Sequence, residues 1–157
     1  MTPPPAAPAP SSLQALQATV LAMPMAHTLG LRFVQAQAGH VELEMPMNEA
    51  FCFRPGQLQA TAVFAIADFA AVAAAGSVLP PGWTNATVDT TLKLVAPAQG
   101  RCLRARGRVV NAARLLTVCA ADVWAVDAAT GHETLCASLL ATARNIEGAT
   151  AAAAARA

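Results

Sequence analysis

The sequence is poor in charged and in aromatic side chains, and both shortages exclude functions. Its 157 residues include 12% charged residues, 4% aromatic residues and no tyrosine, and the formal net charge is only +1. A nucleic-acid-binding domain normally carries a basic patch and aromatic side chains on which bases stack. We therefore expect no nucleic-acid partner.

The shortage of charge also bears on assembly. Hydrophobic residues make up 55% of the chain, which is ample for a core and far too apolar for a disordered protein. A single domain of this length has a large surface to keep in contact with water. We therefore expect part of that surface to be covered in a homo-oligomer.

The four cysteines form neither a metal-binding nor a disulfide pattern. Cys52, Cys102, Cys119 and Cys136 contain no CxxC pair, have no histidine nearby at metal-ligand spacing, and stand among apolar residues. Buried, reduced thiols in a cytoplasmic protein fit this pattern, and we expect no metal and no redox cofactor. The N-terminal residues MTPPPAAPAP lack the basic and apolar regions of a secretory signal.

One long apolar stretch, Ala60 to Leu79, could be mistaken for a membrane span. It contains Asp68 in its middle, and a central aspartate costs about 2.5–3.5 kcal/mol on membrane insertion. A helix that is apolar all round can instead be buried inside a protein. We expect this second arrangement, and no association with a membrane.

Prolines and glycines divide the chain into an α+β pattern. A Pro/Ala-rich tail over residues 1–10 and an Ala-rich tail over residues 148–157 flank a single domain over residues 11–147. The predicted helices are 11–23 and 56–78, and the predicted strands are 31–36, 40–47, 84–95, 101–110, 115–126 and 133–144. Strands that follow one another without crossover helices form an antiparallel sheet. The pattern predicts an antiparallel sheet of five to six strands wrapped around one long central helix.

The long helix carries a single charged side chain in apolar surroundings. Asp68 is the only charged residue between Arg54 and Asp89, and its helical neighbours include Phe64 and Val72. Burial raises the pKa of a carboxyl group, and such groups concentrate at functional sites, although a buried aspartate can also simply anchor a helix. Asp68 is therefore the first candidate for chemistry.

The start of the same helix, residues 56–61, is the second candidate. Its free backbone N–H groups and positive dipole end can bind a carbonyl oxygen or an anion. Gln59 and Asp68 are nine residues apart, which places them on opposite helix faces and about 13 Å apart along the axis. One subunit can hardly bring both groups to one substrate, whereas two subunits related by a two-fold axis can. The spacing predicts a dimer with two composite sites.

Several spacings along the chain together form a recognisable pattern. They are Leu29-Gly30, Gly39, the helix start Gly56-Gln57-Leu58-Gln59-Ala60-Thr61 followed by Asp68, Thr87 ten residues before Pro97, and the hairpin loop from Asp127 to Gly131. The pattern resembles that of the hotdog-fold thioesterases of the phenylacetate-pathway (PaaI-like) type. In that family the helix start reads Gly-x-x-His-Gly-Gly, and an aspartate follows the histidine by nine residues. The resemblance covers residues 24–146.

The resemblance implies an acyl-CoA thioesterase with the hotdog fold. Asp68 then corresponds to the catalytic carboxylate, which acts as nucleophile on the thioester carbonyl or as general base for water. Thr87 corresponds to the hydroxyl that helps to position the water, and the backbone N–H of Ala60, from the partner subunit, to the oxyanion donor. Coenzyme A would enter only as part of the substrate, and the assembly would be a dimer or a dimer of dimers.

Four positions depart from the family pattern. The motif histidine is Gln59, the Gly-Gly pair is Ala60-Thr61, and the loop asparagine is Phe53. Glutamine can hydrogen-bond a thioester but cannot take a proton as histidine does, and alanine and threonine crowd the close backbone approach that glycine permits. These four residues are the expected substrate- and oxyanion-binding positions.

The same departures keep other functions open. One alternative is a hotdog protein that binds an acyl-CoA or a similar ligand with little or no turnover. A second is a purely structural assembly protein. The arginines at positions 104, 106 and 108 lie on one side of a predicted strand, and they form either a solvated face or a contact with the phosphates of coenzyme A.

Overall fold

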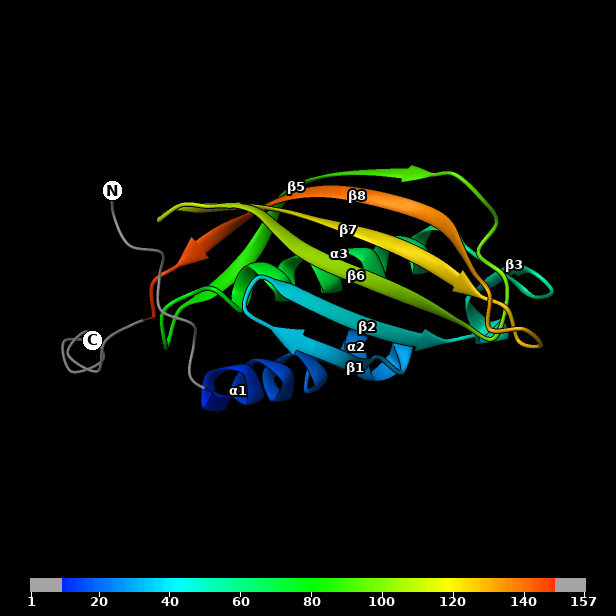
Figure 1. The fold of residues 1–157 in the computed structure, drawn as a ribbon, viewed down its shortest axis with the longest axis horizontal. Helices are drawn as coiled ribbons and strands as arrows, with labels where there is room; N and C mark the ends of the chain where they lie inside the picture. The colour runs from blue at the N-terminus through cyan, green and yellow to red at the C-terminus, as the bar shows by residue number, and fades with distance from the viewer. Residues whose placement is uncertain (1–9, 149–157) are drawn as a thin grey trace.

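A curved six-stranded sheet wraps around one long helix in the computed structural model of the chain (Figure 1). The structure describes residues 10–148, so that the predicted tails lie outside the described residues except for Pro10 and Gly148. The helices are α1 (Pro10–Leu21), α2 (Pro24–Leu29) and α3 (Ala60–Gly76), and the sheet strands are β1 (Arg32–Gln37), β2 (His40–Pro46), β5 (Thr84–Leu94), β6 (Cys102–Ala112), β7 (Leu116–Val126) and β8 (Glu133–Ile146). The strand order is β1-β2-β6-β7-β8-β5, and every neighbouring pair is antiparallel. The predicted fold class is confirmed.

The first prediction that needs correction concerns the N-terminal helix, which ends at Leu21. A second short helix, α2, then begins at Pro24, where the sequence predicts only a stop. Proline lacks an N–H and has a helix-like φ, so it is favoured at the first position of a helix as well as after the end of one. Pro24 therefore follows the end of α1 and is also the first residue of α2.

The second correction concerns the start of the long helix, which begins at Ala60 and not at residue 56. Gly56 has a left-handed backbone with φ of 73°, which a helix cannot continue. The next two residues form β4 (Gln57–Leu58), which pairs with β3 (Cys52–Arg54) after a 3-10 turn, η1 (Glu49–Phe51). This small ribbon leads the chain into α3.

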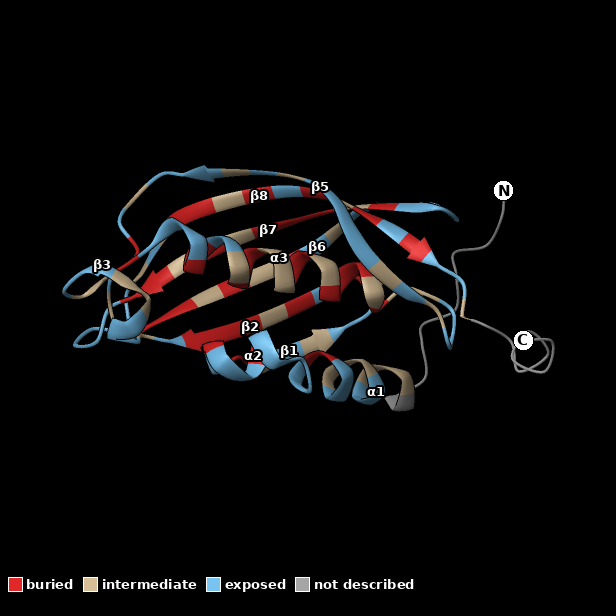
Figure 2. Ribbon diagram, turned by 180° about the vertical axis from the view of Figure 1, so that it is seen from behind, coloured by how far each residue is buried: buried red, intermediate tan, exposed pale blue. Residues whose placement is uncertain are grey.

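The core lies where α3 packs on the concave side of the sheet, as the buried residues in Figure 2 show. The helix face against the sheet consists largely of alanines, and Ala67, Ala70, Ala71 and Ala74 are fully buried. Their small side chains allow the helix backbone to approach the strands closely. At Gly107 of β6 a Cβ atom would overlap the carbonyl oxygen of Ala70.

The opposite end of the sheet from β1 is the long edge strand β5, which within the described chain pairs only with β8. Its eleven residues are mostly exposed, and the exposed hydrophobic residues Val88 and Leu94 lie on it. An edge of this length presents unpaired backbone N–H and C=O groups to another chain.

The close approach of α3 to β6 generates a stability prediction. We expect Gly107→Ala to lower the free energy of unfolding by about 3 kcal/mol or more, because the new methyl group must displace the backbone of α3. Chemical denaturation followed by circular dichroism measures the loss.

Gly131→Ala is the matched control, since Gly131 has φ of 69° but nothing within 4 Å of an added Cβ. It should cost only about 1–2 kcal/mol, the strain of a left-handed alanine. Equal losses in the two variants would contradict the account of close packing.

Candidate active site

The two predicted catalytic residues, Asp68 and Thr87, lie next to each other. Asp68 is half-buried on α3, and its Oδ1 accepts a hydrogen bond of 2.9 Å from the Thr87 hydroxyl on β5. The bond therefore connects the central helix to the edge strand, across 19 positions of sequence. Nothing in the local sequence of either element dictates this contact, which depends on where β5 crosses α3.

The surroundings of Asp68 make its carboxyl group more basic than usual. Burial raises the pKa of Asp68, and the hydrogen bond from Thr87 offsets only part of that increase. A carboxylate with a raised pKa accepts a proton more readily at neutral pH. The site thus holds a carboxylate suited to act as a base or as a nucleophile.

A cavity of about 610 Å³ opens beside this pair. It is lined by one side of α1, the outer face of α3, residues 79–83 and the first residues of β5. Asp68 is the first lining residue on α3, and Thr87 is the last on β5, so that both stand at one end of the cavity. The cavity is of the size that proteins use for small ligands.

The predicted substrate-binding residues at the start of α3 lie away from this cavity. Gln59, Ala60 and Thr61 are exposed at the helix N-terminus, and Phe53 on β3 is 58% exposed. None of the four lines the cavity that holds Asp68. Eight residues separate Ala60 from Asp68, or about 12 Å along the helix axis.

The helix start retains two backbone donors. The carbonyl oxygen of Gln59 accepts hydrogen bonds from the N–H groups of Ala62 and Val63. Within residues 10–148 the N–H groups of Ala60 and Thr61 have no backbone acceptor, because they belong to the first helical turn. These two groups can bind a carbonyl oxygen that reaches the helix start.

The cysteines do not compete with Asp68 as nucleophiles. All four are free thiols, and Cys102, Cys119 and Cys136 are buried, as the sequence predicts. The prediction of burial is wrong for Cys52, which is only partly buried because it lies on the small β3–β4 ribbon. Burial raises the pKa of Cys119 and of Cys136 to about 11, and the charge of Asp68 contributes at Cys119. Thiols of this pKa stay protonated at neutral pH and are poor nucleophiles.

The arginine stripe of β6 lies on the face of the sheet that points away from α3, and carboxylates occupy it. Arg104 lies 2.9 Å from both Glu44 and Glu133, and Arg106 lies 2.8 Å from Glu133. Arg108 pairs with Asp122 at 3.1 Å. These ion pairs indicate that the arginines form a partly solvated face of the sheet and do not bind the phosphates of coenzyme A.

Residues 10–148 contain neither a metal-ligand cluster nor a membrane-spanning helix. No three His, Cys, Asp or Glu side chains in this range come together as ligands of a metal ion would. No helix in this range has the length and apolar character needed to cross a membrane.

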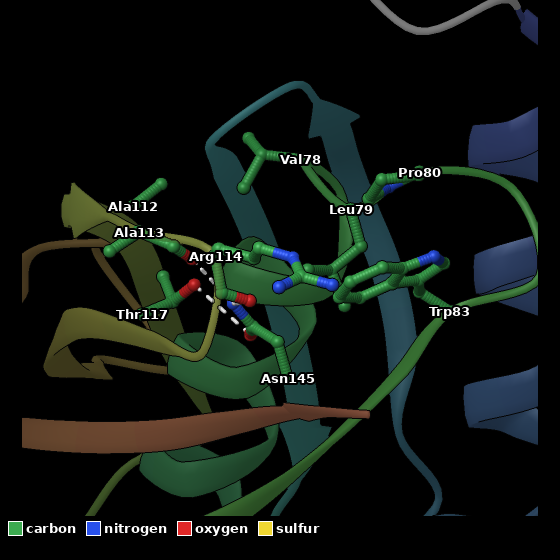
Figure 3. A pocket seen from close by; sticks show the side chains of 9 residues that line it. All are labelled: Val78, Leu79, Pro80, Trp83, Ala112, Ala113, Arg114, Thr117 and Asn145. Carbon is green, nitrogen blue, oxygen red and sulfur yellow. Dashed lines mark hydrogen bonds between the residues drawn. The ribbon is translucent and has the colours of Figure 1, made fainter. Parts of the chain in front are cut away.

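A second cavity of about 390 Å³ lies beyond the C-terminal end of α3, and no sequence pattern predicts it (Figure 3). Thr117 and Asn145 line it and bond to each other at 3.2 Å, and Asn145 also donates to the carbonyl oxygen of Ala113. Trp83 lines both cavities. The residues of α1 that line the cavity beside Asp68 were not predicted from the sequence either. A helix whose apolar side faces a cavity has the same hydrophobic pattern as a helix whose apolar side packs against a core.

Comparisons with known proteins identify the fold and the family. No protein-family model and no curated protein matches the sequence. A crystal structure of a thioesterase family protein from Silicibacter pomeroyi matches with 31% identity and a TM-score of 0.82, over 86% of this chain and 98% of that one. The chain belongs to the thioesterase superfamily, and its fold is the hotdog fold.

Two further solved structures have the same fold. The PaaI protein of the Escherichia coli phenylacetic acid degradation operon has a TM-score of 0.75 at 17% identity, over 87% of this chain and 94% of that one. A thioesterase of Haemophilus influenzae has a TM-score of 0.75 at 19% identity, over 88% and 93%. At these identities the likeness shows the shared fold.

The raised pKa of Asp68 predicts an effect on stability. The ionised carboxylate is less favourable in the folded protein than in the unfolded chain, so it lowers the free energy of unfolding. This loss of stability is complete at pH values above the raised pKa. It shrinks as the pH falls through that pKa and vanishes below the unfolded value of about 3.9. We expect Asp68→Asn to increase the free energy of unfolding at about pH 7, and the increase to fade towards about pH 4. Urea denaturation at several pH values measures both.

Asp127→Asn is the control with the opposite sign. Hydrogen bonds from Thr130 and Ala129 lower the pKa of Asp127, so its carboxylate favours the folded state above the unfolded pKa. Its replacement should destabilise the protein at neutral pH, and the loss should disappear in acid. Changes of the same sign in both variants would contradict this assignment.

Proposed function

We propose that this thioesterase hydrolyses acyl-CoA thioesters, with Asp68 as its catalytic carboxylate. The observation that carries the proposal is the Asp68–Thr87 hydrogen bond at one end of a cavity, in a chain of the thioesterase superfamily. An ionised carboxylate with a raised pKa, next to a space for an acyl group, suits attack on a thioester carbonyl.

The reaction needs a base and a stabilised oxyanion. Acting as a general base, Asp68 takes a proton from a water molecule, whose oxygen attacks the carbonyl carbon. The negative charge moves to the carbonyl oxygen in the tetrahedral intermediate. When the carbonyl double bond forms again, the carbon–sulfur bond breaks and the carboxylic acid is released. The proton held by Asp68 passes to the leaving thiolate. In the alternative route, Asp68 attacks directly and water cleaves the resulting anhydride. Both routes yield the carboxylic acid and free coenzyme A.

Thr87 holds the carboxylate in position in either route. Its hydroxyl donates to Oδ1 of Asp68, which leaves the other carboxylate oxygen for the water or the carbonyl carbon. The two lone pairs of the Thr87 oxygen remain able to accept a hydrogen bond from that water. We infer that Thr87 both orients Asp68 and helps to place the nucleophile.

The oxyanion donor is proposed to come from a second copy of the chain. Ala60 lies about 12 Å from Asp68 along the same helix, so the two cannot meet on one carbonyl group. The long exposed edge strand β5, on which Thr87 lies, is suited to pair with its own copy around a two-fold axis. Phe53 and Phe64 are exposed hydrophobic residues near the start of α3 and would be covered in such a dimer.

The departures from the family motif are compatible with turnover. The proposed donor is the backbone N–H of Ala60, which does not depend on the side chain at that position. Gln59 bonds to Thr61 through its side chain at 3.3 Å, so its amide N–H₂ remains able to donate to a substrate. The alternative, a binding protein with little or no turnover, is favoured by Gln59 and Phe53, which replace a histidine and an asparagine.

Replacing the proposed catalytic carboxylate tests the enzyme against the alternative. We expect Asp68→Asn to lower kcat for acyl-CoA hydrolysis by roughly a thousandfold, because asparagine is neither a base nor a nucleophile. Release of free thiol from a panel of short, long and aryl acyl-CoAs measures it. Asp127→Asn, a carboxylate outside the site, should retain full activity. A folded parent without turnover across the panel would favour the binding protein.

Mixing two inactive variants tests the composite site. Ala60→Pro removes the proposed donor N–H, and proline fits there because Ala60 is the first helical residue and Gln59 before it has an extended backbone. In a mixed dimer with Asp68→Asn, one of the two sites combines an intact carboxylate with an intact donor. Subunit exchange should therefore restore about a quarter of the parent activity.

Two outcomes would contradict the composite site. The first is full activity of Ala60→Pro alone, which would show that this N–H does not take part. The second is a mixture that exchanges subunits, as shown by native mass spectrometry, but remains inactive.

A further inference from the structure

The cavity beside Asp68 is elongated along α3. The lining residues of this helix lie on one face, and they run from Asp68 through Val72 to Gly76 at intervals of one turn. Eight residues separate the first from the last, so this wall is about 12 Å long. Figure 2 shows α3 from the side that the sheet does not cover, with α1 and the first part of β5 on either side of it.

The wall beyond Asp68 and Thr87 offers few polar groups to a ligand. The Thr19 hydroxyl donates to the carbonyl oxygen of Ala15 at 2.9 Å, and the Ser77 hydroxyl donates to Ala74 at 2.6 Å. The Asn85 side-chain amide donates to the carbonyl oxygen of Val72 at 3.0 Å. These polar groups are engaged by the protein itself. The other lining side chains of the helices are mainly apolar, and they include Leu16, Val20, Met23 and Phe69.

We propose that this channel holds a linear hydrocarbon acyl chain of about eight to ten carbons, so that the substrates are medium-chain acyl-CoAs. The inference rests on the proposed function, which places the thioester carbonyl at Asp68. In an extended chain three bonds advance 3.8 Å, or about 1.27 Å for each bond, so a 12 Å channel accommodates about nine bonds, the length of a chain of up to about ten carbons. A compact arylacetyl group would fill only the part nearest the carboxylate.

Trp83 closes the far end of the channel. Leu79, Pro80 and Trp83 line both this cavity and the second cavity of about 390 Å³, so these three side chains separate the two spaces. In Figure 3 the indole of Trp83 and the side chain of Leu79 form one side of the second cavity. Trp83 therefore limits the chain length, and its removal would join the two spaces.

The test is the chain-length profile of kcat/KM for straight-chain acyl-CoAs. For the parent we expect a rise of roughly fourfold for each added methylene that becomes buried, an optimum near eight to ten carbons, and a fall beyond it. Val72→Phe blocks the channel one turn, or about 6 Å, from Asp68, and should move the optimum to about four to six carbons. Trp83→Ala should move it to longer chains.

Ala18→Phe is the matched control, since Ala18 is exposed on α1 and does not line the channel. It introduces the same phenylalanine side chain and should leave the profile unchanged. Should Val72→Phe not fold, as judged by circular dichroism, Leu16→Phe narrows the channel from the opposite wall. Leu16 lies against Gly76, so this variant should also shorten the preferred chain, but by less than Val72→Phe.

Binding of alkyl-CoA thioethers, which cannot be hydrolysed, separates this inference from the proposed function. Hydrolysis with a profile that the channel variants leave unchanged, or with a preference for arylacetyl-CoA, would overturn the channel and keep the thioesterase. Absent hydrolysis, calorimetric affinities that rise with chain length and shift in the variants would support the channel and refute the enzyme. Absence of both hydrolysis and length-dependent binding would overturn both.

Discussion

The close contact between the alanine-rich helix α3 and the concave face of the sheet is the constraint on which the rest of the structure depends. Fully buried Ala67, Ala70 and Ala71 bring the helix backbone to the strands, and Gly107 leaves the space that this approach requires. A helix held at this distance has one covered face and one uncovered face. The covered face supplies the core, and the uncovered face is available for a site.

The site arises where that uncovered face meets the edge strand. Asp68 projects from α3 beside β5, and Thr87 on β5 donates a hydrogen bond to it. Partial burial raises the pKa of Asp68, because it removes water that would stabilise the ionised carboxylate and only the hydrogen bond from Thr87 opposes this effect. The same packing leaves a cavity between α1, α3 and β5. A basic carboxylate and an apolar space therefore result from one arrangement of three elements.

Much of the fold was predictable from local sequence, and the errors have local causes. Periodic hydrophobicity located the strands of the sheet and the long helix, because these elements each bury a regular face. The boundaries near Pro24 and Gly56 were wrong, since proline is favoured both after a helix and at its first position, and a left-handed glycine interrupts an otherwise helical pattern. Asp68 was identifiable because a lone charge in an apolar helix is conspicuous.

The sequence by itself determined the sheet around a central helix, the burial of Cys102, Cys119 and Cys136, and the position of Asp68 nine residues after Gln59. Periodicity and spacing carry that information, since they act within single elements. Only the tertiary structure decided that Thr87 contacts Asp68, that α1 closes a cavity, and that Trp83 separates two spaces. These contacts join elements far apart in the chain. Their geometry is set by how closely α3 can pack, which no single segment encodes.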